Sequence, residues 1–146
     1  VLIIIGSKSD MEYAEKSKEQ LSQFGIAGDI HVCSAHRDPQ KTAELTSQAE
    51  KNGYEVIIAM AGLSAALPGV AAAHSNLPVI GVPLPAALDG MDSLLSTVQM
   101  PPGIPVAAVA IGKPGAANAA VLAARILALK HSDVKTALIK HRESIK

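Results

Sequence analysis

Five short apolar runs recur along the chain, and they show no alternation of polar and apolar residues. They are residues 1–5, 30–33, 56–60, 78–82 and 105–110. Each has the length of a strand, they are rich in β-branched residues, and several are bounded by glycine or proline. Continuous apolar runs of this kind are typical of strands that are covered on both faces. The pattern therefore predicts the buried strands of a parallel sheet.

The polar segments between these runs carry signals for helices. Ser9 and Glu12 have capping-box spacing at the start of an amphipathic segment, and Gly25 is placed to end it. Asp38 followed by Pro39 predicts an N-cap and the first residue of a second helix, which should run toward residues 52–53.

Three further helical segments complete the pattern. An alanine-rich segment lies between the prolines at 68 and 78, residues 115–130 form an alanine-rich helix pattern, and residues 132–145 form a polar one. Strands and helices thus alternate along the chain, which predicts an α/β domain with a mostly parallel sheet and right-handed crossovers. The final polar helix is expected outside the central layers, against another subunit.

Composition narrows the class of protein. The chain has 146 residues, which suits one domain over residues 1–146, and 13 basic residues balance 13 acidic ones. A zero net charge argues against a nucleic-acid or anionic-membrane surface, and 49% hydrophobic with 18% charged residues excludes intrinsic disorder. No apolar run approaches the roughly 20 residues that span a bilayer. One cysteine, Cys33, is expected to be a buried small residue, and it favours a reducing, cytoplasmic compartment.

Ligands of open parallel sheets bind beyond the carboxyl ends of the strands, where three loops carry polar or small residues. The first loop, residues 6–10, joins a strand to a helix. Gly6 would allow close approach of a ligand, the hydroxyls of Ser7 and Ser9 could hold a phosphate, and Asp10 could accept hydrogen bonds from a sugar. The alternative is an ordinary capped turn with Ser9 as the cap.

The second loop, residues 34–39, combines a hydroxyl, an imidazole and a guanidinium. Ser34 and Arg37 could bind phosphate, because arginine offers a planar fork of donors. His36 is a candidate acid–base group, because imidazole titrates near neutral pH. The alternative is a surface turn in which Arg37 pairs with Asp38.

The third loop, residues 61–69, has almost no side chains able to do chemistry. Its backbone could pass over a flat ring, or it could simply turn into a packing helix. Of the other histidines, His31 is expected to pack or to lie at a sheet edge, and His131 and His141 are expected to be solvated. Because no helical metal-binding spacing such as H-E-x-x-H occurs, we expect no metal.

Together these motifs resemble the PurE family, the catalytic subunit of phosphoribosylaminoimidazole carboxylase. The matching stretches are GSKSD (6–10), SAHRDP (34–39), AGLSAALPG (61–69), LPVIGVPL (77–84), LDGMDSLLSTVQMPPGIPVAAVAIG (88–112) and GAANAAVLAARILAL (115–129). The resemblance implies a three-layer αβα sandwich with a central parallel sheet, flavodoxin-like or Rossmann-like, plus an extra C-terminal helix. It also implies a homo-octamer with active sites at subunit junctions.

The resemblance implies a purine-biosynthetic enzyme that needs no cofactor and no metal. One type in the family converts N5-carboxyaminoimidazole ribonucleotide (N5-CAIR) to 4-carboxy-5-aminoimidazole ribonucleotide (CAIR), through released CO2. The other type carboxylates 5-aminoimidazole ribonucleotide (AIR) directly with CO2. Under either reading the partners are a ribonucleotide and CO2, and the mutase reading is favoured here.

Residue by residue, the resemblance gives roles to the three loops. Ser7 and Asp10 match positions that hold phosphate and ribose, and Ser34 and Arg37 match phosphate-binding positions. His36 matches the general acid–base histidine. The backbone of the third loop should pass beside the imidazole ring and the CO2 pocket, with substrate contacts at Gly62, Ser64 and Ala65.

One position departs from the mutase pattern. Mutase-type members usually read G-G-A-A-H-L-P-G in the third loop, and here Ala66 stands where that histidine would be, with Leu63 in place of a glycine. Direct carboxylases lack the histidine too, but they carry an arginine and an asparagine that this chain also lacks. A third reading therefore stays open, that of a catalytically impaired or binding-only member.

Overall fold

Five parallel strands form the centre of the computed structural model, which describes residues 1–145. The strands are β1 (Leu2–Ile5), β2 (Asp29–Val32), β3 (Ile57–Ala61), β4 (Val79–Pro83) and β5 (Ala107–Ala108). Their order across the sheet is β2-β1-β3-β4-β5, the flavodoxin-like order. The predicted α/β class and parallel sheet are thus confirmed.

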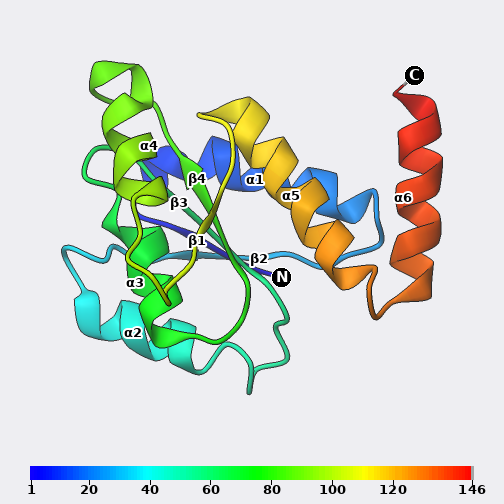
Figure 1. Cartoon of the computed structure of the whole chain (residues 1–146), viewed down its shortest axis with the longest axis horizontal. Coiled ribbons are helices and arrows are strands. Elements are labelled where there is room, and N and C mark those ends of the chain that lie inside the picture. The colour runs from blue at the N-terminus through cyan, green and yellow to red at the C-terminus, as the bar shows by residue number, and fades with distance from the viewer. Residues whose placement is uncertain (146) are drawn as a thin grey trace.

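Helices cover both faces of the sheet (Figure 1). One face packs against α1 (Met11–Ser22) and α5 (Lys113–Leu127), and the other against α2 (Pro39–Ser47), α3 (Ala66–His74) and α4 (Met91–Val98). The central strands supply both layers because successive side chains point to opposite faces. In β1, Ile3 and Ile5 face the first layer and Leu2 and Ile4 the second, and all four are fully buried.

The last helix, α6 (Ser132–Ser144), stands outside the three layers, as predicted, and within this chain it packs on α5 (Figure 1). The two histidines predicted to be solvated, His131 just before α6 and His141 within it, are only partly exposed, and each makes a contact. The Nε2 atom of His131 lies 2.7 Å from a carboxylate oxygen of Glu55, and the His141 ring meets the Phe24 ring edge-on at 5.1 Å. Both histidines therefore attach α6 to the body of the domain.

Other differences from prediction lie at the ends of elements. Ser9 does not cap the first helix: the Ser7 side chain caps a short 3-10 turn (Lys8–Asp10) that precedes α1, accepting from the Ser9 backbone N–H. The Asp38 cap is confirmed, with its carboxylate accepting from the Lys41 backbone N–H at 3.2 Å.

Three elements are shorter or more exposed than their sequences suggested. The helix α2 ends at Ser47, and β5 pairs with β4 over only two residues of the run 105–110. β2 is an edge strand, so His31 and Val32 are exposed. Sequence runs alone do not distinguish an edge strand from a central one. Across the described residues, no helix combines the length and apolarity that crossing a membrane requires.

Candidate active site

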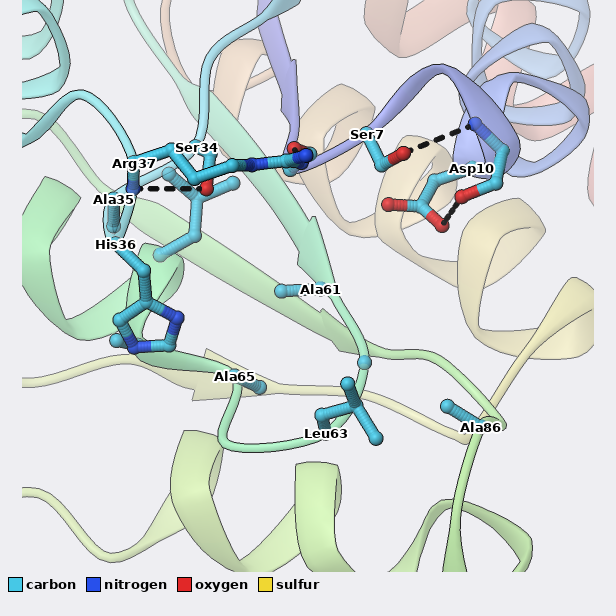
Figure 2. Close-up of a pocket in the computed structure, with 15 residues that line it drawn as sticks. Ser7, Asp10, Ser34, Ala35, His36, Arg37, Ala61, Leu63, Ala65 and Ala86 are labelled. Atoms are coloured by element: carbon cyan, nitrogen blue, oxygen red, sulfur yellow. Dashed lines mark hydrogen bonds between the residues drawn. The ribbon is translucent and has the colours of Figure 1, made fainter.

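The three loops predicted at the carboxyl ends of the strands meet around one cavity of about 340 Å3 (Figure 2). A fourth segment, the loop after β4, completes its wall. The residues that line the cavity are Gly6, Ser7, Ser9, Asp10, Ser34, Ala35, His36, Arg37, Ala61, Gly62, Leu63, Ala65, Ala66, Leu67 and Ala86. Parallel strands all end at the same edge of the sheet, which is why loops so distant in sequence converge here.

The first loop presents polar groups that are already ordered by one another. The Ser7 hydroxyl oxygen accepts a hydrogen bond from the Ser9 backbone N–H at 3.3 Å. The Ser9 hydroxyl in turn donates to the Asp10 carboxylate at 3.1 Å. This chain of contacts fixes the Asp10 carboxylate beside the cavity, where it can accept hydrogen bonds from a hydroxylated ligand.

The second loop is attached to the first by Arg37. Its Nη2 atom donates to the Gly6 carbonyl oxygen at 2.8 Å, and its backbone N–H donates to the Ser34 hydroxyl at 3.3 Å. The alternative of an Arg37–Asp38 ion pair is wrong: no such pair forms within residues 1–145. A guanidinium has five N–H donors, so most of them remain available to an anion in the cavity.

The cavity has a polar side and an apolar side. Figure 2 shows Ser7, Asp10, Ser34 and Arg37 along one side, and the third loop with Ala86 along the other. The exposed ring of His36 lies at one end, reaching from the polar side toward the apolar loop. An imidazole there would meet the ring system of a ligand whose anionic group lies near Arg37.

The third loop packs closely at Gly62. A Cβ on Gly62 would lie 3.2 Å from the Ala86 Cβ and 3.4 Å from the Leu84 carbonyl oxygen. The loop then leads into α3, whose first residue is Ala66 and whose preceding residue, Ala65, makes no side-chain capping bond. The third-loop residues that line this wall have no polar side chains, so its hydrogen-bonding groups are those of the backbone.

Most of the candidate residues come together, with one exception. His36 and seven of the eight predicted binding residues line the cavity, whereas Ser64 is exposed and does not. Sequence reasoning missed Ala86, which carries no chemical signal of its own. The rule that ligands bind at strand ends could have found it, because Ala86 follows the end of β4.

Lysines lie beside the cavity. An adjoining hollow of about 400 Å3 shares Gly6, Ser7, Ser34 and Arg37 with it and adds Lys8 and Lys41. Positive charge thus gathers around the Arg37 end of the site, which favours an anionic ligand group there. Within residues 1–145, no three histidine, cysteine or acidic side chains are grouped so that they could hold a metal ion.

The chain is similar throughout its length to proteins of one family. The family model described as AIR carboxylase matches residues 1–146. An N5-carboxyaminoimidazole ribonucleotide mutase of Saccharolobus solfataricus is 52% identical over 147 residues, which cover 100% of this chain and 92% of that protein. The mutase of the same name from Pseudomonas aeruginosa is 50% identical, covering 96% of this chain and 86% of its own.

A solved structure agrees with these similarities. The crystal structure of Treponema denticola PurE superimposes with a TM-score of 0.86 at 32% sequence identity. The match covers 98% of this chain and 89% of the Treponema chain. The three-layer fold implied by the family resemblance is therefore confirmed.

Proposed function

Because the chain belongs to the AIR carboxylase family, we propose that it is a purine-biosynthetic mutase that interconverts N5-CAIR and CAIR. The observation that carries this assignment is the arrangement of the cavity: an anion-binding end at Arg37, a backbone-lined wall opposite, and His36 between them. The relatives named above share the mutase activity in their names, which favours it over direct carboxylation of AIR.

The polar side of the cavity suits the ribose phosphate of the substrate. We assign the phosphate to Ser7, Ser34 and Arg37, because two hydroxyls and a guanidinium can surround a phosphate with donors. Asp10, held by the Ser9 hydroxyl, would accept hydrogen bonds from the ribose hydroxyls. The ring of the substrate would then lie along the third loop, beside the backbone from Gly62 to Ala65.

The reaction needs one carboxylate and one proton to change places. Cleavage of the bond between the exocyclic nitrogen and its carboxylate leaves the electron pair on nitrogen and releases CO2. The ring carbon C4 then attacks CO2 with its π electrons and loses its proton. In the balance, C4 gives up one proton and the exocyclic nitrogen gains one.

His36 is the group that we assign to this proton. A single imidazole that starts protonated can give a proton to the exocyclic nitrogen as CO2 leaves and take one back from C4 after CO2 has been recaptured, since an imidazole nitrogen can both donate and accept a proton. The net reaction is an isomerisation, so the histidine ends each turnover in its starting state. No ATP or other group carrier is required for a transfer of this kind.

The alanine at position 66 is the reason for testing two alternative functions. It lines the cavity as the first residue of α3, and it brings no polar atom to the reacting region. If a second imidazole were needed at this point, the chain would bind the ribonucleotide with little or no turnover. Direct carboxylation of AIR is the other alternative, and it requires CO2 or bicarbonate as a second substrate.

We also propose a homo-octamer with shared active sites, working in the cytoplasm. The helix α4 supports an assembly, because it exposes an apolar stripe of Met91, Leu95 and Val98, each 47–50% exposed. The loop that leads from β4 toward α4 contributes Ala86 to the cavity wall, so a subunit docked on α4 would lie near the site. Light scattering would test the assembly, and a stable monomer would contradict it.

The test of function is a direct comparison of two substrates. Enzyme is incubated with N5-CAIR without added bicarbonate and, separately, with AIR plus bicarbonate, and CAIR is measured by chromatography. We expect CAIR from the first reaction. CAIR from the second alone would establish a carboxylase, and ribonucleotide binding without product in either would establish a binding-only protein.

His36→Asn tests the acid–base role against a matched control. The variant should bind ribonucleotide but lose turnover by about 10²-fold or more. His74→Asn removes an exposed histidine at the far end of α3, outside the cavity, and should leave turnover unchanged. Retained turnover in His36→Asn would refute the assignment.

A further inference from the structure

Leu63 combines two unfavourable features at the mouth of the cavity. Its backbone has a φ of 56°, in the left-handed region, and its side chain is 57% exposed. Left-handed backbone is costly for a residue with a Cβ, and glycine avoids that cost. A large apolar side chain in solvent gains nothing from burial.

The free chain shows no packing that would compensate for this cost. Leu63 belongs to neither of the two hydrophobic clusters found among residues 1–145, whereas Leu67 on the same segment is 2% exposed. Residues whose backbone strain is not offset by packing are concentrated at functional sites. Leu88, with a φ of 45° and 75% exposure, shares both features but does not line the cavity, so it is the place of Leu63 on the cavity wall that points to a role in the occupied site.

The position of Leu63 indicates what that role is. Figure 2 shows it on the apolar side of the cavity, between Ala65 and Ala86 and across from Ser7 and Asp10. The residues around it are small: a Cβ added to Gly62 would lie 3.2 Å from the Ala86 Cβ. Among the residues that line the cavity, Leu63 is the one large apolar side chain that is exposed.

We propose that Leu63 covers the apolar side of the occupied site and retains CO2 during the carboxylate transfer. This proposal rests on the proposed function. When the carbamate C–N bond breaks, CO2 carries no charge and offers no strong hydrogen-bonding group for the protein to hold. Its capture by C4 therefore depends on walls that slow its escape, and an apolar side chain over the small-residue wall is such a barrier.

Leu63 is thus a positioning residue that decides how CO2 is partitioned between recapture and loss. Replacing it should change the fate of the released CO2 more than the affinity for the nucleotide. Under the proposed function the phosphate and ribose would lie on the other side of the cavity, where Figure 2 shows Ser7 and Asp10 across from Leu63. A loss of CO2 retention without a loss of nucleotide affinity would therefore distinguish this role from a purely structural one.

The experiment follows the carboxylate carbon itself. N5-CAIR carrying ¹³C in its carboxylate is converted with enzyme in excess, in buffer that contains unlabelled bicarbonate, and the labelled fraction of CAIR is measured by mass spectrometry. Free AIR is measured in the same samples. Leu63→Gly removes both the side chain and the strain, Leu63→Ala removes only the side chain, and Leu129→Ala is the control at a leucine 90% exposed far from the cavity.

We expect the wild-type protein and Leu129→Ala to keep most of the label in CAIR. Both Leu63 variants should keep several-fold less and should release correspondingly more AIR, while their affinity for CAIR changes by less than about twofold. Thermal unfolding of Leu63→Gly should occur no earlier than in the wild type, because glycine tolerates the left-handed backbone. A folded variant with altered label retention would then exclude a stability effect.

Three outcomes would overturn the proposal. The first is label retention in Leu63→Gly equal to that of the wild type. The second is a change in the mass of the assembly that accounts for the loss of retention, which would make Leu63 a subunit contact. The third is no CAIR from N5-CAIR with the wild type, which would overturn the proposed function as well and is therefore distinguishable from the first two.

Discussion

The proposed phosphate-binding role of Arg37 can be tested separately from the other proposed roles of the site. One of its N–H donors is already used, because Nη2 bonds the Gly6 carbonyl oxygen at 2.8 Å. The remaining donors can form a fork with a phosphate. Arg37→Lys keeps the positive charge but supplies a single ammonium, which cannot reach both the Gly6 carbonyl and a phosphate with the same geometry.

The expected loss follows from the number of bonds removed. One hydrogen bond to a charged group contributes about 1.5–3 kcal/mol. Because about 1.4 kcal/mol corresponds to a tenfold change in affinity, Arg37→Lys should weaken ribonucleotide binding by roughly 10- to 150-fold. Loss of the bond to Gly6 should reduce the stability of the fold by about 1 kcal/mol at most, since the side chain is exposed.

Calorimetric titration with two ligands isolates the phosphate. AIR carries the phosphate, and the corresponding ribonucleoside lacks it. Arg37→Lys should bind AIR 10- to 150-fold more weakly and the nucleoside with unchanged affinity. Arg125→Lys, at an exposed position on α5, is the control. An equal loss for both ligands, or no loss for AIR, would show that Arg37 does not bind the phosphate.

Three further substitutions test other parts of the molecule. Ala66→His places an imidazole on the cavity wall, and because we assign the proton to His36 alone, CAIR formation should be little changed; a rise of about 10²-fold or more would show that a second imidazole is needed. Glu55→Gln should lower the melting temperature at pH 7: hydrogen bonds from Lys130 and His131 lower the pKa of Glu55, so its stabilisation is present above its unfolded pKa and is lost as the pH falls through the lower folded pKa. Because Glu55 is partly exposed, we expect the substitution to cost about 1 kcal/mol or less. The difference in melting temperature between the wild type and Glu55→Gln should therefore be larger at pH 7 than at pH 3. Gly81→Ala should destabilise the fold by about 1–3 kcal/mol in urea titrations, because the new Cβ would overlap the Thr97 side chain and lie 2.8 Å from Val106; an unchanged midpoint would contradict the packing described for α4.

The sheet and the site were predictable from the sequence for the same physical reason. Buried parallel strands require continuous apolar runs, and their carboxyl ends require loops at one edge. The first, second and third loops are therefore expected side by side, because they follow the runs 1–5, 30–33 and 56–60. The cavity residues that carry polar side chains were identified in this way.

The misses arose where the answer depends on contacts between distant segments. His131 bonds Glu55, 76 positions away, and the direction in which the chain turns after α5 decides this contact. His141 meets Phe24 for the same reason. Ala86 contributes only a methyl group to the cavity wall, and no local pattern marks an alanine as part of a site.

Capping residues show how local competition limits prediction. Ser7 and Ser9 are both good N-caps by type, and the capping-box spacing favoured Ser9. The chain instead forms a 3-10 turn before α1, which leaves Ser7 to cap the turn and Ser9 to hold Asp10. The gain is an ordered carboxylate at the cavity, in the position that the proposed ribose contact requires.

The two sides of the cavity imply two separable classes of variant. We place the phosphate, which substrate and product share, at Arg37 and Ser34, so the loss of either side chain should weaken affinity without changing the fate of CO2. Leu63 lies on the opposite side, so its loss should change that fate with little effect on affinity. His36, which reaches from one side toward the other, is placed to affect the proton transfer. A variant of Arg37 that altered label retention, or a variant of Leu63 that abolished nucleotide binding, would contradict this division of the site.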